Sequence, residues 1–166
     1  MRIAHISDVH IRKTRRHKEY AEVLDNLCNS IESLGVDRIA LPGDLLHNKT
    51  DLSPEAVTLT SLYLDRLSDI APIDMVLGNH DCVINQHDRE DSLSPVVRML
   101  KKQNKPINLF LESGMYDVTE DLTYGVSHNK TQYTNGPLSL TVKKVDTMSH
   151  FFMEQLMVVK QALVIG

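Results

Sequence analysis

Three short stretches of the sequence carry residue types that bind metal ions or transfer protons. They are Asp8 to His10, Gly43 to Asp44, and Gly78 to Asp81. Each comes directly after an apolar run that is typical of a buried strand. Because ligands gather at the carboxyl ends of strands in open α/β sheets, we expect the three stretches to meet at one edge of a parallel sheet. The sequence therefore predicts half of a metal site there.

The side chains of these stretches form a mixed set of oxygen and nitrogen ligands. Asp8 and His10 are two residues apart, so in an extended chain both side chains point the same way and can bind one ion. The two oxygens of Asp44 can bridge two ions, and Asn79 can give the second ion a neutral oxygen. Such a set suits Mn²⁺, Fe²⁺ or Zn²⁺ better than Ca²⁺ or Mg²⁺.

Two ions about 3.5–4 Å apart polarise a phosphoryl group and lower the pKa of a water molecule. His80 would then stabilise the developing charge or protonate the leaving oxygen. We expect Asp81 to hold the His80 ring in place. Each motif alone has an ordinary alternative as loop or turn residues. The three motifs together, each after a strand, favour phosphoester hydrolysis.

The three motifs resemble the first three motifs of the calcineurin-like metallophosphoesterases. Within that superfamily the chain is similar to SbcD-type double-strand-break repair nuclease subunits, including viral recombination endonuclease subunits. This narrower match depends on His47, three residues after Asp44, and on the segment 88–95 that follows the third motif. The resemblance covers about residues 1–127 and implies the α/β calcineurin-like fold, a sheet sandwich flanked by helices, in its N-terminal half only.

The resemblance also implies a role for each matching residue. Asp8 and His10 bind the first ion, Asp44 bridges, and Asn79 binds the second ion, the two ions being Mn²⁺. His80 is catalytic together with Asp81, and His47 helps to place the scissile backbone. For His47, a loop residue that caps the next helix is the ordinary alternative.

The family's later histidines, in a Gly-His context and a Gly-His-x-His motif, have no counterpart here. After Asp81 the histidines are His87, His128 and His150, and none follows a glycine. We therefore predict a metallophosphoesterase domain, N-terminal half, at residues 1–127 and a divergent or truncated tail at 128–166. His128 follows a strand-like run and is one candidate for a replacement ligand. The isolated chain is expected to hydrolyse its substrate slowly.

The resemblance implies metal-dependent hydrolysis of phosphodiesters in DNA by a repair or recombination nuclease subunit. Its implied partners are DNA and an SbcC-type coiled-coil ATPase, and a homodimer is also compatible. Two alternatives remain: a phosphomonoesterase or cyclic-nucleotide phosphodiesterase on the same scaffold, and a non-catalytic fragment that binds one ion.

A basic stretch next to the first motif favours nucleic acid. Arg12, Lys13, Arg15 and Arg16 follow His10 closely. Phosphate contacts supply most of the affinity for nucleic acid, so this stretch is a candidate DNA-binding rim. A solvated loop is the ordinary alternative, and acidic residues soon follow.

Composition sets the broad class of the protein. The chain has 166 residues, of which 42% are hydrophobic and 24% charged, and its net charge is −4. This composition predicts about one globular domain and excludes a protein that is basic throughout. We expect no signal peptide, membrane span or disulfide, and a cytoplasmic or other reducing intracellular location. A virus-encoded origin is compatible with this location.

The predicted elements place the motifs at strand ends. An alternation of strands and helices up to residue 77 predicts a parallel sheet with helices packed on it. Three shorter strands from residue 107 onward predict a change to antiparallel pairing. The predicted strands are 2–7, 37–41, 73–77, 107–111, 115–118, 122–127 and 138–145, and the predicted helices are 17–34, 54–68, 96–103 and 149–163.

Overall fold

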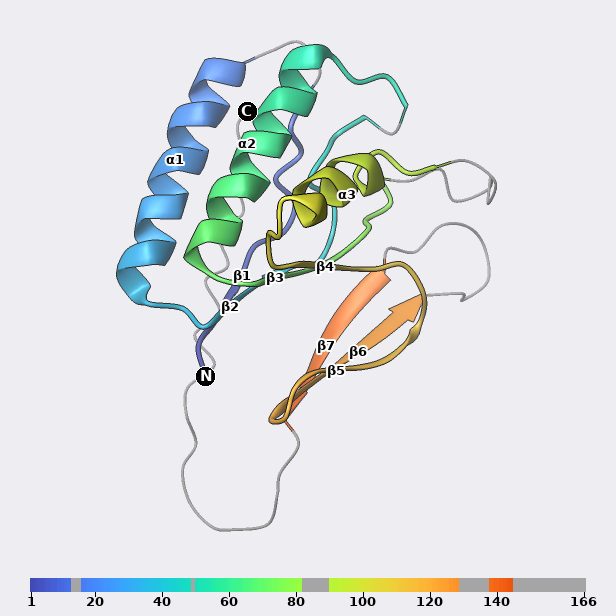
Figure 1. Cartoon of the computed structure of the whole chain (residues 1–166). Coiled ribbons are helices and arrows are strands. Elements are labelled where there is room, and N and C mark those ends of the chain that lie inside the picture. Colours follow the sequence, from blue (N-terminus) through green and yellow to red (C-terminus); the bar gives the residue numbers. More distant parts are fainter. Residues whose placement is uncertain (13–15, 49, 82–89, 129–137, 145–166) are drawn as a thin grey trace.

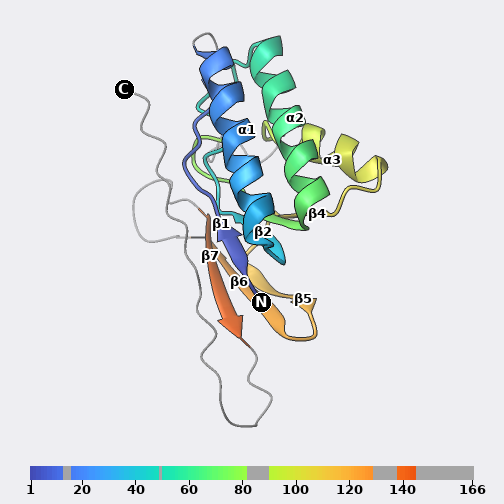
Figure 2. The ribbon, with the colours of Figure 1, turned by 90° about the vertical axis from the view of Figure 1, so that its left-hand side faces the viewer.

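A computed structural model of the chain describes residues 1–12, 16–48, 50–81, 90–128 and 138–144. Four parallel strands form one sheet in the order β1-β2-β3-β4. Three helices cover one face of this sheet, and a second sheet of three strands lies on its other side (Figures 1 and 2). The predicted α/β class with helices on a parallel sheet is confirmed. The bounds of the parallel strands are β1 (Ile3–His5), β2 (Arg38–Leu41), β3 (Ile73–Val76) and β4 (Ile107–Phe110).

The helices are α1 (His17–Leu34), α2 (Pro54–Ile70) and α3 (Ser94–Lys102). Helix α1 buries an apolar stripe that includes Tyr20 and Leu24, and it ends at Gly35, whose φ of 56° is left-handed. The first turn of α2 is capped by Ser53, whose hydroxyl oxygen accepts a hydrogen bond of 3.2 Å from the Ala56 amide. Among the described residues, no helix combines the length and the apolar character needed to cross a membrane.

The two central strands of the parallel sheet are buried along their whole length. Their core contains a charged pair, because Arg38 donates two hydrogen bonds of 2.6 and 2.8 Å to Asp74 on the neighbouring strand. Asn108 on β4 donates a third bond of 2.8 Å to the same carboxylate. This network joins β2, β3 and β4 in one register.

The second sheet consists of β5 (Gly114–Thr119), β6 (Leu122–His128) and β7 (Leu138–Lys144), all antiparallel. On β6, Leu122, Tyr124 and Val126 are buried, and the Tyr124 ring lies 6.1 Å from the Phe110 ring of β4. This contact joins the two sheets.

One part of the predicted topology was wrong. The strand from Ile107 does not begin the antiparallel region but pairs in parallel with β3. Helix α3 acts as a third crossover between β3 and β4, which returns the chain in the same direction. Antiparallel pairing begins only with β5. The helix predicted at 149–163 lies outside the described residues.

Candidate metal centre

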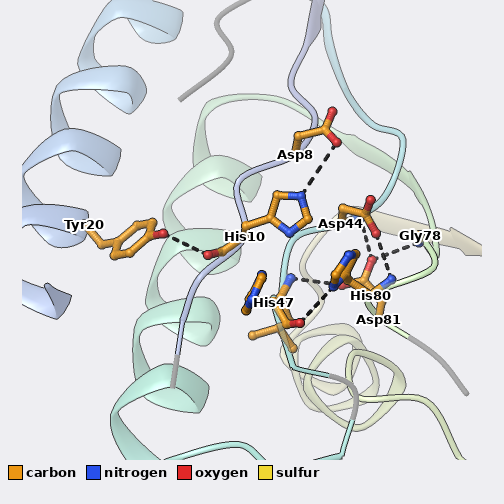
Figure 3. A network of polar contacts seen from close by, with 9 residues as sticks. Asp8, His10, Tyr20, Asp44, His47, Gly78, His80 and Asp81 are labelled. Carbon is orange, nitrogen blue, oxygen red and sulfur yellow. Dashed lines mark hydrogen bonds and ion pairs between the residues drawn. The ribbon is translucent and has the colours of Figure 1, made fainter. Parts of the chain in front are cut away.

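The loops after β1 and β2 bring three candidate ligands together. Asp8, His10 and Asp44 each offer a ligand atom within 4.8 Å of the other two. Nε2 of His10 lies 3.8 Å from the nearer oxygen of Asp8 (Figure 3). The Asp8 side chain is 60% exposed and the His10 side chain 30%, so the cluster opens to solvent. The predicted convergence of these three residues is therefore present in the structure.

Backbone hydrogen bonds hold the two loops in parallel beyond the end of the regular sheet. The His10 amide donates to the carbonyl of Asp44 at 3.0 Å, and the Ile11 amide donates to that of Leu45 at 2.9 Å. The His47 amide then donates to the carbonyl of Ile11 at 3.0 Å. Because the loops are bonded to each other in this register, the side chains of His10 and Asp44 stay on neighbouring positions. This bonding was not predicted, because no local pattern marks it.

Helix α1 holds the first loop from the other side. The Tyr20 hydroxyl, on the first turns of α1, donates a hydrogen bond of 2.8 Å to the carbonyl of His10 (Figure 3). Tyr20 also belongs to the buried apolar stripe of the helix. In the sequence, the tyrosine hydroxyl is the signal for this contact, since a buried tyrosine normally finds a hydrogen-bond partner.

All three clustered ligands have left-handed backbone. The φ angles are 59° at Asp8, 51° at His10 and 56° at Asp44. Asp and His tolerate this region better than most residues, and such strained conformations cluster at functional sites. Asp8 and His10 therefore come together for a different reason than predicted, because the chain at these two residues is not extended. Two left-handed residues fold the loop so that the side chains approach.

Two glycines let the loops after β2 and β3 touch. A Cβ on Gly43 would lie 2.6 Å from Cα of Gly78, and one on Gly78 would lie 2.7 Å from Cγ of Asp44. Any side chain at Gly78 would therefore displace the Asp44 carboxylate. The amide of His80 also donates a 2.9 Å hydrogen bond to Oδ1 of Asp44, which fixes that oxygen.

Asp81 has a different position from the one predicted. Its carboxylate is fully buried and accepts hydrogen bonds from the amides of Asp44 at 2.7 Å, Leu46 at 2.9 Å and Gly78 at 2.9 Å. Burial raises the pKa of Asp81, and the bonds from these amides oppose the rise. The expectation that Asp81 holds the His80 ring was wrong, because the carboxylate turns to the backbone and joins the two loops instead.

The His80 ring is held by the loop after β2. Its Nδ1 lies 2.9 Å from the carbonyl oxygen of His47 (Figure 3). A carbonyl only accepts, so Nδ1 carries the hydrogen and Nε2 is left for other contacts. The rings of His47 and His80 are stacked, with centroids 5.2 Å apart. His10 meets the His80 ring edge-on at 4.8 Å.

The surroundings of His47 disfavour its protonated form. Burial lowers the pKa of His47, and the charges of Arg12, His10 and His80 lower it further. Arg12 therefore lies close enough to the histidines to influence them. Its side chain is exposed, and its carbonyl accepts a 2.6 Å hydrogen bond from Nε2 of His17.

The remaining predicted residues are only partly placed. Asn79 is half-buried in the turn between Gly78 and His80, next to the cluster. Arg16 is exposed and directly precedes α1, whereas Lys13 and Arg15 lie outside the described residues. The side chain of His128, at the end of β6, lies outside them as well.

The donor set of the cluster fits a divalent ion. Two carboxylates and an imidazole supply oxygen and nitrogen ligands, as Mn²⁺, Fe²⁺ and Zn²⁺ accept. In the described part of the chain, Nδ1 of His10 and Nδ1 of His47 are buried without a hydrogen-bond partner. Buried polar atoms normally have a partner, so these two nitrogens indicate that the loops are arranged around a ligand.

Comparison with known sequences identifies the family. A profile of the calcineurin-like phosphoesterases matches residues 1–157. The chain belongs to this family. The phosphoesterase match extends past residue 127, where the motif resemblance ends, and the boundary between domain and tail stays a prediction. Members of this family are metal-dependent phosphoester hydrolases, and the cluster at the strand ends is where this chain carries residues for that chemistry.

Two relatives narrow the comparison. The phosphoesterase is 39% identical over 129 residues to an uncharacterised protein of Acanthamoeba polyphaga mimivirus, and the match covers 75% of this chain and 9% of that protein. It is 35% identical over 104 residues to one of the subunits of the nuclease SbcCD of Bacillus subtilis strain 168, and this match covers 58% of the chain and 25% of the relative. The chain thus spans a quarter or less of the length of these curated relatives.

Proposed function

We propose that this phosphoesterase hydrolyses phosphodiester bonds in DNA, as the nuclease subunit of a break-repair or recombination system. The observation that carries the proposal is the cluster of Asp8, His10 and Asp44, with ligand atoms within 4.8 Å of one another. The likeness to a nuclease subunit supports the choice of substrate. The open position of the cluster also favours a long substrate over a small enclosed one.

The ligands divide between two ions in this proposal, and we expect both ions to be Mn²⁺. Asp8 and His10 would hold the first ion, Asp44 would serve both ions, and Asn79 would give the second ion a neutral oxygen. When bound, the ions supply Lewis acidity to the phosphoryl group and lower the pKa of the attacking water. The hydrogen bond from the His80 amide fixes Oδ1 of Asp44 and so helps to keep this carboxylate beside Asp8 and His10.

His80 is proposed to act on the leaving oxygen. The carbonyl of His47 accepts the hydrogen of Nδ1, so the ring is oriented and Nε2 is free to exchange a proton with the substrate. His47 is proposed to place the scissile backbone with its own ring, which lies stacked on that of His80. Asp81 acts indirectly, because it holds the two loops that carry Asp44 and His80.

The basic rim is proposed to hold the DNA backbone. Arg12 and Arg16 are exposed on the loop that continues from the metal ligands into α1. Lysine and arginine contacts to phosphates give affinity without reading sequence. The relative from Bacillus subtilis is named as a part of the nuclease SbcCD. On this basis we propose an SbcC-type coiled-coil ATPase as partner, and a homodimer as the assembly.

The test compares substrate classes under one set of conditions. The purified chain with Mn²⁺ is given end-labelled linear DNA, a nitrophenyl phosphate diester, a nitrophenyl phosphate monoester and a cyclic nucleotide. We expect slow cleavage of the DNA and of the diester, and an Asp44→Asn variant without activity. Faster turnover of the monoester or the cyclic nucleotide would favour the alternative enzymes. No turnover of any substrate, with Mn²⁺ still bound, would identify a non-catalytic protein.

A further inference from the structure

Three imidazoles lie close together beside the carboxylates: His47 and His80 are stacked, and His10 meets both of them edge-on. Nitrogens of His10, His47 and His80 lie within 4.8 Å of one another, and each side chain is half-buried. They come from the three loops after β1, β2 and β3, so the sheet itself brings them together. This histidine cluster shares only His10 with the cluster of Asp8 and Asp44.

Each ring of the histidine cluster has a nitrogen available for a ligand. His10 turns one nitrogen toward Asp8 and the other away from it (Figure 3), and its Nδ1 is buried without a hydrogen-bond partner. Nδ1 of His47 is buried in the same way. His80 donates from Nδ1 to the His47 carbonyl, which leaves Nε2 as its ligand atom. Each of the three rings thus has a nitrogen that can bind an ion.

Both clusters can accept Zn²⁺, but their ligand chemistry makes the histidine cluster the better zinc site. Three imidazoles and an open fourth position form a typical zinc donor set, whereas carboxylate and water oxygens are the ligands that suit Mn²⁺. Around a tetrahedral Zn²⁺ with bonds of about 2.0–2.1 Å, neighbouring nitrogens are about 3.3 Å apart. The nitrogens must therefore approach by about 1.5 Å at most, and the stacked rings of His47 and His80 must turn toward one ion. Rotations of half-buried side chains between rotamers allow both changes.

We propose that His10, His47 and His80 form a Zn²⁺ site that competes with the hydrolytic arrangement. Zn²⁺ in this site takes His10 from the Mn²⁺ ligands and withdraws His47 and His80 from the substrate. The consequence for activity rests on the proposed function, whereas the binding of Zn²⁺ does not. Zinc is then an inhibitor of this phosphoesterase, while Mn²⁺ supports it.

Metal titrations of the full 166-residue chain test the site. Zn²⁺ affinity is measured by competition with a chromophoric chelator, and Mn²⁺ affinity by the loss of the free-ion electron paramagnetic resonance signal. We expect His47→Ala to weaken Zn²⁺ binding by at least about tenfold, the lower end of what loss of an outer-shell partner costs. The same variant should leave Mn²⁺ binding unchanged. Asp44→Asn should do the reverse.

Two controls make the result specific. His17→Ala removes a histidine from the start of α1, and a triple variant removes His87, His128 and His150; both should bind Zn²⁺ like the original chain. His47→Gln repeats the test with a side chain of similar size, and circular dichroism checks that each variant is folded. Zn²⁺ binding that survives in both His47 variants, or that falls with Asp44→Asn or with the triple variant, would overturn the proposal.

Activity measurements distinguish a failure of this inference from a failure of the proposed function. If the chain cleaves DNA, Zn²⁺ added to the Mn²⁺ enzyme should abolish cleavage, and a chelator selective for Zn²⁺ should restore it. Cleavage that continues with Zn²⁺ bound would overturn the inhibitory role. If no substrate is cleaved, the proposed function fails, and the titrations still decide whether the histidine cluster binds Zn²⁺.

Discussion

Asp8 carries a backbone conformation that works against stability. Its φ of 59° is left-handed, while its side chain is mostly exposed and contributes little to packing. The φ angles of His10 and Asp44 are also left-handed, so all three residues of the cluster have this backbone conformation. A left-handed residue other than glycine costs about 1–2 kcal/mol. We infer that the loop conformation is maintained for ligand geometry.

This interpretation predicts opposite effects of two substitutions at one position. Asp8→Gly should raise the free energy of unfolding of the metal-free protein by about 0.5–1 kcal/mol, because glycine accepts positive φ. Asp8→Ala removes the same carboxylate without that freedom and should be less stable than Asp8→Gly. Both should lose affinity for Mn²⁺. Chemical denaturation with and without Mn²⁺ measures these differences, and equal stability of the two variants would show that the backbone is not strained.

Asp81 is expected to be a residue at which a small change costs much of the stability. Asp81→Ala leaves three amides, of Asp44, Leu46 and Gly78, without their buried acceptor. At about 1 kcal/mol for each amide, the loss should be about 3 kcal/mol or more. Urea unfolding measures it. A loss below about 1 kcal/mol would contradict the central role of these hydrogen bonds.

Residue types at strand ends could be predicted from the sequence, whereas their contacts could not. The convergence of Asp8, His10 and Asp44 followed from the rule that parallel strands end at one edge of a sheet. The contacts of Asp81 could not follow, because its partners are backbone amides, two of which lie 35 and 37 residues away in the chain. Every residue except proline has a backbone amide, so the sequence does not indicate which amides a buried carboxylate will bind.

At the scale of elements, periodicity and caps were sufficient for the three helices among the described residues. The bounds of α1 agree with the prediction because an apolar stripe and a glycine stop coincide. Strand direction was harder, since a short apolar run does not reveal its partner. The nine-residue helix α3 turned β4 into a parallel strand where an antiparallel one was predicted.

The buried pair of Arg38 and Asp74 ties the strands that carry the site. Asp74→Ala should lower the free energy of unfolding by about 3–5 kcal/mol, because it leaves a buried arginine without its partner. Replacing both residues with apolar ones, as in Arg38→Met with Asp74→Leu, should recover most of that loss. Asp69→Ala, which breaks an exposed pair with Lys105, is the matched control and should cost less than about 1 kcal/mol.

Chemical denaturation measures the free energies of unfolding of these variants and so tests whether an apolar pair can replace the charged pair. A double apolar variant as unstable as Asp74→Ala would mean that the charges themselves, rather than a satisfied core, hold β2 against β3.

At the scale of the whole molecule, metal binding should be visible as stability. An ion bound only by the native state stabilises the fold, by about 2.7 kcal/mol at a concentration one hundred times its dissociation constant. Mn²⁺ should therefore raise the melting temperature, and Asp44→Asn should remove the shift. Thermal melts with and without millimolar Mn²⁺ measure it. An unchanged midpoint of the original chain would count against a formed site.

His80 lies beside the candidate ligands and is not among the Mn²⁺ ligands of the proposed site, so its proposed role in cleavage can be tested separately from metal binding. The decisive measurement is the rate at which the purified chain cleaves end-labelled linear DNA with Mn²⁺, compared with the rate of His80→Ala. We predict slow cleavage by the original chain, and a loss of about 100-fold or more in the variant, the lower limit for a general acid, with the Mn²⁺ melting shift retained. Cleavage at the same rate by His80→Ala would contradict the proposed hydrolysis.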